Sequence, residues 1–311
     1  MANDRERALE LWQEMAAAMA PTNPDQPPSP EQLRHAYDRW AQANFPPPAD
    51  LLIEPVDAAG VPGLWARIEG SERKPTILYL HGGGYMIASA RGYARTAADL
   101  ARSAEANVLL VDYRLAPENA FPAAVDDAVA AYTWLTTRQD PSTVVVAGDS
   151  AGGGLVAALL VDLRDRGRVL PAAGVCISAW LDMTLSSESI TTKAAVDPVM
   201  SAPMLQGMAA AYLQGARADL PLASPLFADL EDLPPLLVMT GTWDSLTDDS
   251  IRFAAAARRV GVEVTLAVFE EMYHCWHIMT PVLAESRSAI AQIGEFCRQH
   301  TGLVARQVES R

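Results

Sequence analysis

Cysteine is scarce in the 311-residue sequence, and long apolar runs are absent. Three cysteines (Cys176, Cys275 and Cys297) cannot form a disulfide framework, and an odd number is typical of a reducing compartment. No run of about 18 or more apolar residues is present to form a membrane-spanning helix. The N-terminal region is charged where a signal peptide would have its apolar core. We therefore expect a cytoplasmic protein that does not enter a membrane.

Basic residues are also scarce. The chain has 24 Lys and Arg against 38 Asp and Glu, which gives a net charge of −14. Because nucleic acids and anionic membranes are bound through clustered Lys and Arg, we expect neither as a partner. Hydrophobic residues make up 50% of the chain. The composition and length therefore allow one large α/β domain, or two small ones, with a sizeable core.

Two helices are predicted before the first strand. In the first twenty residues, apolar side chains recur at the spacing of one helix face, at Leu9, Leu11, Met15 and Met19. A Pro-rich joint over residues 20–33 follows this helix. The second helix is predicted over residues 30–44, and it ends before the sequence FPPPAD.

From residue 50 the pattern changes to short apolar runs separated by helical stretches. Residues 50–57 and 63–70 predict an antiparallel pair of strands. Six further runs are typical of strands buried on both faces: residues 76–80, 108–112, 144–148, 174–178, 236–240 and 263–269. Helical stretches between them, such as residues 95–105, predict a mostly parallel sheet with right-handed crossovers and helices on both sides. The long segment at residues 183–220 predicts an inserted helical lid.

The run at residues 144–148 leads directly into the sequence GDSAGGG. It contains Gly-x-Ser-x-Gly at Gly148, Ser150 and Gly152. The pentapeptide alone is a weak signal, because such a short pattern recurs by chance. Between a strand and a helix, however, it predicts a sharp turn that raises the Ser150 hydroxyl above the sheet, beside a helix N-terminus. Ser150 is therefore the candidate nucleophile.

A His-Gly-Gly-Gly sequence at residues 81–84 follows another apolar run. A glycine run is usually a flexible loop. At the end of a strand it also presents backbone N–H groups to an oxyanion, since side chains would block the approach. We expect Gly83, Gly84 and Ala151 to be these donors, and His81 to hold the loop by hydrogen bonding.

A serine nucleophile needs a histidine base and a carboxylate that orients the base. The histidines that follow Ser150 are His274, His277 and His300. His300 lies in the final helical stretch, away from any strand end. His274 and His277 both follow the run at residues 263–269, and we favour His274 because it lies nearer to the end of that run.

The predicted carboxylate is Asp244, which follows the run at residues 236–240 and a glycine turn. Asp248 and Asp249 lie a few residues further along the chain. We expect these two to begin the next helix, where carboxylates cap free N–H groups.

The sequence His274-Cys275-Trp276-His277 also suggests a metal site. A structural or catalytic metal needs further ligands, and no second cluster of Cys and His exists in the sequence to supply them. Cys176 and Cys297, in a predicted strand and a predicted helix, are typical of small buried hydrophobes. We expect neither a metal ion nor an organic cofactor.

Taken together, the motifs resemble those of the hormone-sensitive-lipase-like family of α/β-hydrolases, also called bacterial family IV esterases. The resemblance covers about residues 50–300 and rests on five segments in the family's order: YLHGGGY, VDYRLAPENAFPAAVDD, GDSAGGG, GTWDSLTDD and EEMYHCWH. Two positions depart from the family's pattern. Ala88 stands where the glycine-rich loop usually has Gly, and Ser245 stands where Pro commonly follows the acid.

The resemblance implies an α/β-hydrolase fold with an eight-stranded, mostly parallel sheet. It implies that residues 1–48 and the insertion at about residues 183–220 form a helical cap on the hydrolase domain at residues 49–311. It places the family's nucleophile, acid and base at Ser150, Asp244 and His274, and its oxyanion donors at Gly83, Gly84 and Ala151. Members of the family often form homodimers.

The expected activity is hydrolysis of short- to medium-chain esters through an acyl-enzyme. Residues 224–241 and 261–277 are similar to a bacterial subgroup that includes monoterpene ε-lactone hydrolases, so a lactone is an alternative substrate. We expect the substrate pocket to include Tyr85, Trp180, Met204 and Met208. The same site could serve an amidase or a dehydratase of a natural product. A receptor like the plant gibberellin receptors is disfavoured, because such receptors have lost a catalytic group.

Overall fold

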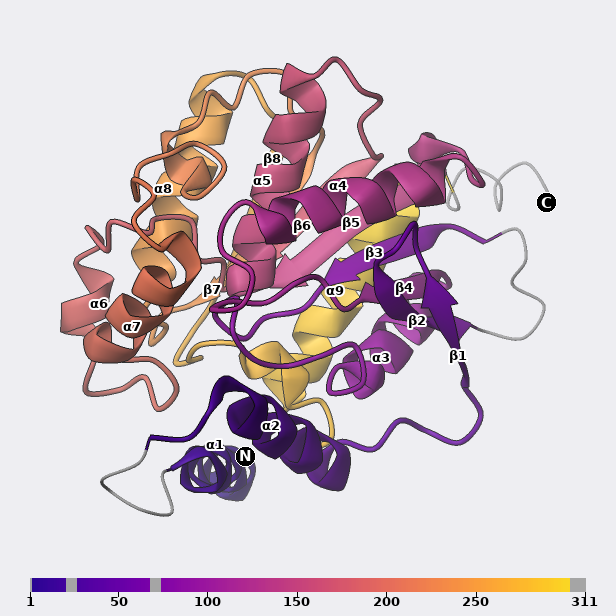
Figure 1. Cartoon of the computed structure of the whole chain (residues 1–311). Coiled ribbons are helices and arrows are strands. Elements are labelled where there is room, and N and C mark those ends of the chain that lie inside the picture. Colours follow the sequence, from indigo (N-terminus) through magenta and orange to yellow (C-terminus); the bar gives the residue numbers. More distant parts are fainter. Residues whose placement is uncertain (1, 21–26, 68–73, 303–311) are drawn as a thin grey trace.

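A computed structural model describes residues 2–20, 27–67 and 74–302 of the chain. Its centre is an eight-stranded sheet in the order β1-β2-β4-β3-β5-β6-β7-β8 (Figure 1). The strands are β1 (Leu52–Asp57), β2 (Pro62–Arg67), β3 (Thr76–Leu80), β4 (Asn107–Val111), β5 (Val144–Asp149), β6 (Ala173–Ile177), β7 (Leu236–Gly241) and β8 (Val264–Phe269). Only the β1–β2 and β2–β4 pairs are antiparallel. The predicted fold class, a mostly parallel α/β-hydrolase sheet, is confirmed.

The helices are α1 (Ala2–Met19), α2 (Pro30–Asn44), α3 (Ala94–Ala104), α4 (Ala123–Thr136), α5 (Ala151–Asp165), α6 (Ser189–Thr192), α7 (Ala202–Leu213), α8 (Thr247–Arg259) and α9 (Ala284–His300). Short 3₁₀ helices are η1 (Pro141–Thr143), η2 (Pro225–Phe227) and η3 (Trp276–Ile278). Both predicted N-terminal helices are present. Two parts of the sequence predictions, residues 21–26 of the Pro-rich joint and residues 68–70 of the second strand, lie outside the described residues.

Two apolar cores lie on the two faces of the sheet. Helices α4, α5 and α8 cover one face, and α3 and α9 cover the other (Figure 1). Successive strand residues point to opposite faces, so Leu78 and Leu80 of β3 enter the first core while Ile77 and Tyr79 enter the second. The second core continues into α1 and α2 through Trp12 and Trp40, two of its buried side chains.

The segment at residues 183–220 contains α6 and α7 and no strand among its residues, all of which the structure describes. Figure 1 shows these two helices at one side of the sheet and α1 with α2 beneath it. No helix in the described ranges is long and apolar enough to cross a membrane.

Two carboxylates of helix α8 accept hydrogen bonds from the backbone at and just before the start of this segment. Asp248 and Asp249 lie in its first turn, as predicted, but their carboxylates do not cap their own helix. Asp248 accepts a hydrogen bond from Ser189 N (2.8 Å), and Asp249 accepts from Leu181 N (2.9 Å) and Asp182 N (3.0 Å). The capping prediction is therefore corrected, because the free backbone donors after β6 lie within reach of these carboxylates.

Candidate active site

Ser150 occupies a strained turn between β5 and α5. Its backbone has φ 53° and ψ −123°, in a region that residues with a side chain rarely adopt. The turn brings the start of α5 so close to β3 that a Cβ on Gly152 would lie 2.0 Å from the carbonyl oxygen of Leu80. Glycine is therefore required beside the serine, as the Gly-x-Ser-x-Gly pattern predicts.

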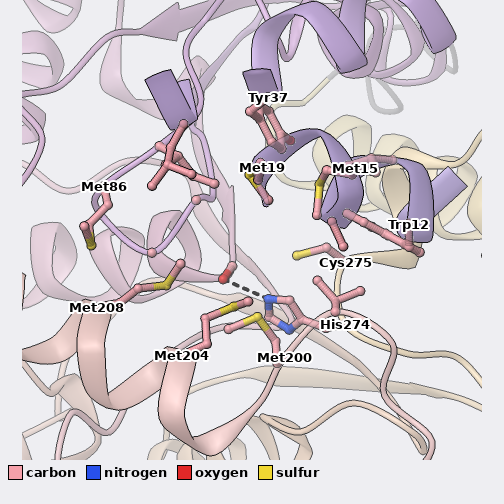
Figure 2. A pocket seen from close by; sticks show the side chains of 18 of the residues that line it. Trp12, Met15, Met19, Tyr37, Met86, Met200, Met204, Met208, His274 and Cys275 are labelled. Atoms are coloured by element: carbon pink, nitrogen blue, oxygen red, sulfur yellow. Dashed lines mark hydrogen bonds between the residues drawn. The ribbon is translucent and has the colours of Figure 1, made fainter. Parts of the chain in front are cut away.

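Three predicted residues meet at the carboxyl ends of the parallel strands. His274, in the loop after β8, has its Nε2 2.9 Å from Ser150 Oγ, which is the dashed contact in Figure 2. Its Nδ1 lies 3.0 Å from Oδ1 of Asp244, which follows β7. Asp244 is fully buried and also accepts a hydrogen bond from Leu246 N (2.8 Å). The serine, the imidazole and the carboxylate form one continuous chain of hydrogen bonds.

The other histidines lie away from the serine. His277 lies in the short 3₁₀ helix η3, and its Nε2 is 3.1 Å from the hydroxyl of Tyr79 in the core. His300 ends α9, where Nδ1 donates to Phe296 O (2.9 Å). The preference for His274 over His277 therefore agrees with the hydrogen bonds at Ser150.

Neighbouring carboxylates help to give His274 and His277 different pKa values. Burial lowers the pKa of His274, but Asp244, Asp197 and Asp149 raise it, and the net pKa lies above its usual value. Burial lowers the pKa of His277 to about 4, and Asp149 offsets this effect only in part. His277 is therefore neutral at physiological pH, whereas His274 is held ready to accept a proton.

The glycine loop lies beside the serine. Gly83 and Gly84 have positive φ values of 107° and 62°, and both border the same cavity as Ser150. Ala151 is the first residue of α5, where a backbone N–H has no partner within the helix. His81 Nδ1 donates to Gly82 O (2.7 Å), so this histidine holds the loop as expected.

Asp149, directly before Ser150, is a site residue that the sequence analysis did not identify. It is fully buried. Its Oδ1 accepts from Tyr79 OH (2.8 Å) and Gly82 N (3.2 Å), and its Oδ2 accepts from Tyr93 OH (2.7 Å) and the Cys275 thiol (3.3 Å). One carboxylate thus bonds both to Gly82 of the glycine loop and to Cys275, the residue after His274. Its position inside the GDSAGGG sequence was the available signal.

The cysteines are buried thiols. Burial raises the pKa of Cys176 and of Cys297 to about 12, as expected for small buried hydrophobes. Burial also raises the pKa of Cys275, whose backbone N–H donates to Ser178 Oγ (3.1 Å) and so fixes the His274 loop. The described residues contain no cluster of three His, Cys, Asp or Glu side chains arranged to hold a metal ion. The expectation that no metal or cofactor is needed stays a prediction.

A cavity of about 340 Å³ opens at Ser150 and His274. Figure 2 shows apolar side chains on two sides of the cavity, with Trp12, Met15 and Met19 on one side and Met200, Met204 and Met208 on the other. One wall comes from α1. The other comes from Met204 and Met208 of α7 and from Met200, two residues before that helix. Helices from distant parts of the chain therefore enclose the site.

Two of the four predicted pocket residues, Met204 and Met208, border this cavity. Tyr85 and Trp180 do not, and that expectation is corrected. Tyr85 stacks on Tyr212 with ring centroids 3.9 Å apart, and Trp180 is fully buried with its indole N–H donated to Asp182 O (3.1 Å). Both side chains point into the core beneath the site. The pattern of α1 alone did not indicate that it would supply the opposite wall, although the family resemblance implied a cap built from residues 1–48 and the insertion.

Comparisons with known proteins agree with this architecture. A family model described as α/β hydrolase fold matches residues 77–278. A crystal structure of an esterase from the bacterial hormone-sensitive lipase family superimposes with a TM-score of 0.91 at 43% identity, covering 97% of this chain and 99% of that one. The chain belongs to the hormone-sensitive-lipase-like α/β-hydrolases.

Other members of this hydrolase family are similar over most of their length. An acetyl-hydrolase of Streptomyces hygroscopicus is 43% identical over 276 residues, which are 88% of this chain and 91% of that protein. An esterase of Acinetobacter venetianus is 32% identical over 270 residues, 86% of this chain and 88% of the relative. As a hormone-sensitive-lipase-like hydrolase with such relatives, the protein is an enzyme of the carboxylesterase type.

Proposed function

We propose that the protein hydrolyses carboxylic esters through an acyl-enzyme, with Ser150 as nucleophile, His274 as general base and Asp244 as the acid that orients the base. The observation that carries this proposal is the chain of hydrogen bonds from Ser150 Oγ to His274 Nε2 (2.9 Å) and from His274 Nδ1 to Asp244 (3.0 Å). This arrangement suits proton transfer from a serine hydroxyl as it attacks a carbonyl carbon.

In the first step Ser150 Oγ attacks the ester carbonyl carbon as His274 takes its proton. A tetrahedral intermediate forms, and the imidazolium is stabilised by Asp244. His274 then gives that proton to the leaving alcohol, which leaves the acyl group on Ser150. In the second step His274 takes a proton from water, and the hydroxide that forms attacks the acyl carbon. The tetrahedral intermediate collapses to release the carboxylic acid, and Ser150 recovers its proton from His274. None of these steps calls for a metal or an organic cofactor.

The backbone N–H groups of Gly83, Gly84 and Ala151 are the proposed oxyanion donors. The support is their position: the two glycines border the cavity with Ser150, and Ala151 begins the helix that starts at the nucleophile. Losing one oxyanion donor slows a serine protease by about 10²–10³-fold, so by analogy these groups would carry a large share of the rate enhancement.

The proposed substrates are neutral esters with short- to medium-length acyl chains, or lactones of similar size. The cavity supports this class because its two walls are apolar and rich in methionine, a side chain that adapts to irregular ligands. Chain-length selectivity is expected to be graded, since one methylene changes binding by roughly 1–3 kcal/mol.

The test combines turnover with covalent labelling. Wild-type protein is expected to hydrolyse p-nitrophenyl butyrate and to bind one fluorophosphonate per chain, whereas Ser150→Ala, with an unchanged circular dichroism spectrum, does neither. Ser142→Ala, which removes an exposed hydroxyl outside the cavity, serves as the matched control and should behave as wild type. Full turnover by Ser150→Ala would refute the assignment.

A further inference from the structure

Asp197 is a buried acid in the segment that forms the cavity wall. It lies between α6 and α7 and is only 7% exposed. Its Oδ1 accepts hydrogen bonds from Val199 N (3.0 Å) and Met200 N (3.3 Å). Val199 and Met200 both border the cavity. One oxygen of this carboxylate therefore fixes the backbone of the wall that faces Ser150.

The second oxygen of Asp197 reaches the loop of the proposed catalytic acid. Oδ2 accepts from Ser245 N at 2.8 Å, and Ser245 directly follows Asp244. A proline at this position would have no N–H to donate. Ser245, which departs from the Pro that commonly follows the acid in this family, is thus what allows the wall and the acid loop to share one carboxylate.

The charge of Asp197 is coupled to the charges of Asp244 and His274. Burial raises the pKa of Asp197 and Asp244 raises it further, whereas His274 and the N–H donors of Ser245 and Val199 lower it. In return, Asp197 is among the carboxylates that raise the pKa of His274. The hydrogen bonds of Asp197 in the described structure come from N–H donors, which suits the ionised carboxylate.

We propose that Asp197 is a positioning residue that aligns the cavity wall and the loop of Asp244 with each other. The inference rests on the proposed function, because it concerns the acid and the pocket of that reaction. The Ser245 bond acts on kcat, since it holds the acid that orients His274. The Val199 and Met200 bonds act on KM, since they hold a surface against which the acyl chain lies.

The first experiment removes the Ser245 N–H by substituting a proline, the residue that commonly follows the acid in this family. Ser245→Pro is compared with Ser245→Ala, because the alanine variant loses a hydroxyl that has no hydrogen bond in the described structure but keeps the N–H. With p-nitrophenyl butyrate, kcat of Ser245→Pro is expected to fall about three- to tenfold below that of Ser245→Ala, the equivalent of one hydrogen bond. KM is expected to change less than kcat.

The second experiment removes the charge. In Asp197→Asn the amide nitrogen must face an N–H donor at one of its two oxygen positions, so we expect kcat to fall at least as far as in Ser245→Pro. KM is expected to rise more for an octanoate ester than for an acetate ester. Adding Ser245→Pro to Asp197→Asn should lower kcat little further, because both changes break the same contact.

The pH profile separates this role from a merely structural one. The titratable groups that face His274 are Asp244 after β7, Asp149 at the end of β5, Asp197, and Cys275 and His277 of its own loop. Removing the negative charge of Asp197 lowers the pKa of His274. The acid limb of kcat/KM therefore moves to lower pH in Asp197→Asn and moves less in Ser245→Pro, which keeps the carboxylate.

Rates are expressed per serine titrated with a fluorophosphonate, so that loss of folded protein does not count as loss of kcat. The inference is overturned if Ser245→Pro matches Ser245→Ala, or if a folded Asp197→Asn keeps the kcat, KM and acid limb of the wild type. Should Asp197→Asn not fold, the comparison of the two Ser245 variants decides alone. A wild type that is neither active nor labelled refutes the proposed function itself. An active wild type whose variants are unchanged refutes only the role of Asp197.

Discussion

His274 and His277 lie three residues apart on one loop, yet their surroundings give them different properties. Both rings are buried. The His274 ring lies between Ser150 and Asp244, with three carboxylates raising its pKa. The His277 ring contacts a tyrosine hydroxyl, and burial lowers its pKa to about 4. Of the two rings, His274 alone has a serine hydroxyl from which to accept a proton and a carboxylate that stabilises the imidazolium formed.

Alanine substitutions test this difference. His274→Ala is expected to lower kcat by about 10⁴-fold or more, because the serine loses its base. His277→Ala is expected to retain most of kcat but to lose about 1–3 kcal/mol of unfolding free energy, since the buried Tyr79 hydroxyl loses a partner. Turnover of p-nitrophenyl butyrate and urea unfolding measure the two effects. Loss of turnover in His277→Ala alone would contradict the assignment.

At the scale of elements, α8 connects the loop after β6 to the segment at residues 183–220 through Asp249. Burial raises the pKa of Asp249 to about 7, although Ser187 and the N–H groups of Leu181 and Asp182 donate to it and lower it. The unfolded chain releases this proton near pH 4. Between those values the folded protein binds the proton more strongly than the unfolded chain does.

Asp249 therefore makes stability fall as the pH rises. Its contribution is fully present below about pH 4 and is lost by the time the pH passes about 7, a change of roughly 2–4 kcal/mol. Asp249→Asn keeps acceptors for the backbone donors but has no proton to lose. Urea unfolding at pH 5 and pH 8 is expected to show a smaller difference for Asp249→Asn than for the wild type.

The control for this experiment is Asp229→Asn, which removes one negative charge from an exposed side chain. Its difference between pH 5 and pH 8 should match that of the wild type if the effect belongs to the buried carboxylate. Equal differences for all three proteins would show that Asp249 does not hold a proton in the folded state.

The sequence predicts a helix, strand or turn well where the residues of that element alone carry its pattern. The apolar runs match β3 to β8 to within a residue at each end, and the glycines around Ser150 indicated the turn. Tyr85 and Trp180 were misplaced because a position near a strand end does not say which way a side chain points. Asp149 and Asp197 were missed because the hydrogen bonds that join them to the site, from Gly82 N and from Ser245 N, come from segments far away in the sequence.

At the scale of the whole molecule, the cavity depends on α1 meeting the segment at residues 183–220. Trp12 is 3% exposed, stacks on Trp40 at 5.5 Å and borders the cavity. The amphipathic pattern of α1 predicted a helix, but nothing local could place that helix opposite α7. The homodimer and the cytoplasmic location that we expected from the sequence stay predictions, which sedimentation and cell fractionation would test.

Trp12→Ala tests the role of α1 as a wall. Removing this surface is expected to raise KM for an octanoate ester about tenfold, with a much smaller change for an acetate ester, because only the longer chain reaches the wall. Leu9→Ala is the matched control, since Leu9 also belongs to α1 and packs against the core but does not border the cavity. Equal shifts in both variants would assign the effect to helix stability instead.

The docking of α1 also sets an order of events during synthesis. Trp12 packs edge-on against Tyr273 (6.5 Å between ring centroids), and Arg5 pairs with Glu271 and with Glu285 (2.9 Å). Helix α1 is therefore synthesised well before the partners that hold it in place. Until those partners are made, its apolar face stays exposed to water and to chaperones. The cavity wall that α1 supplies can therefore form only after the loop that carries Tyr273 has been made.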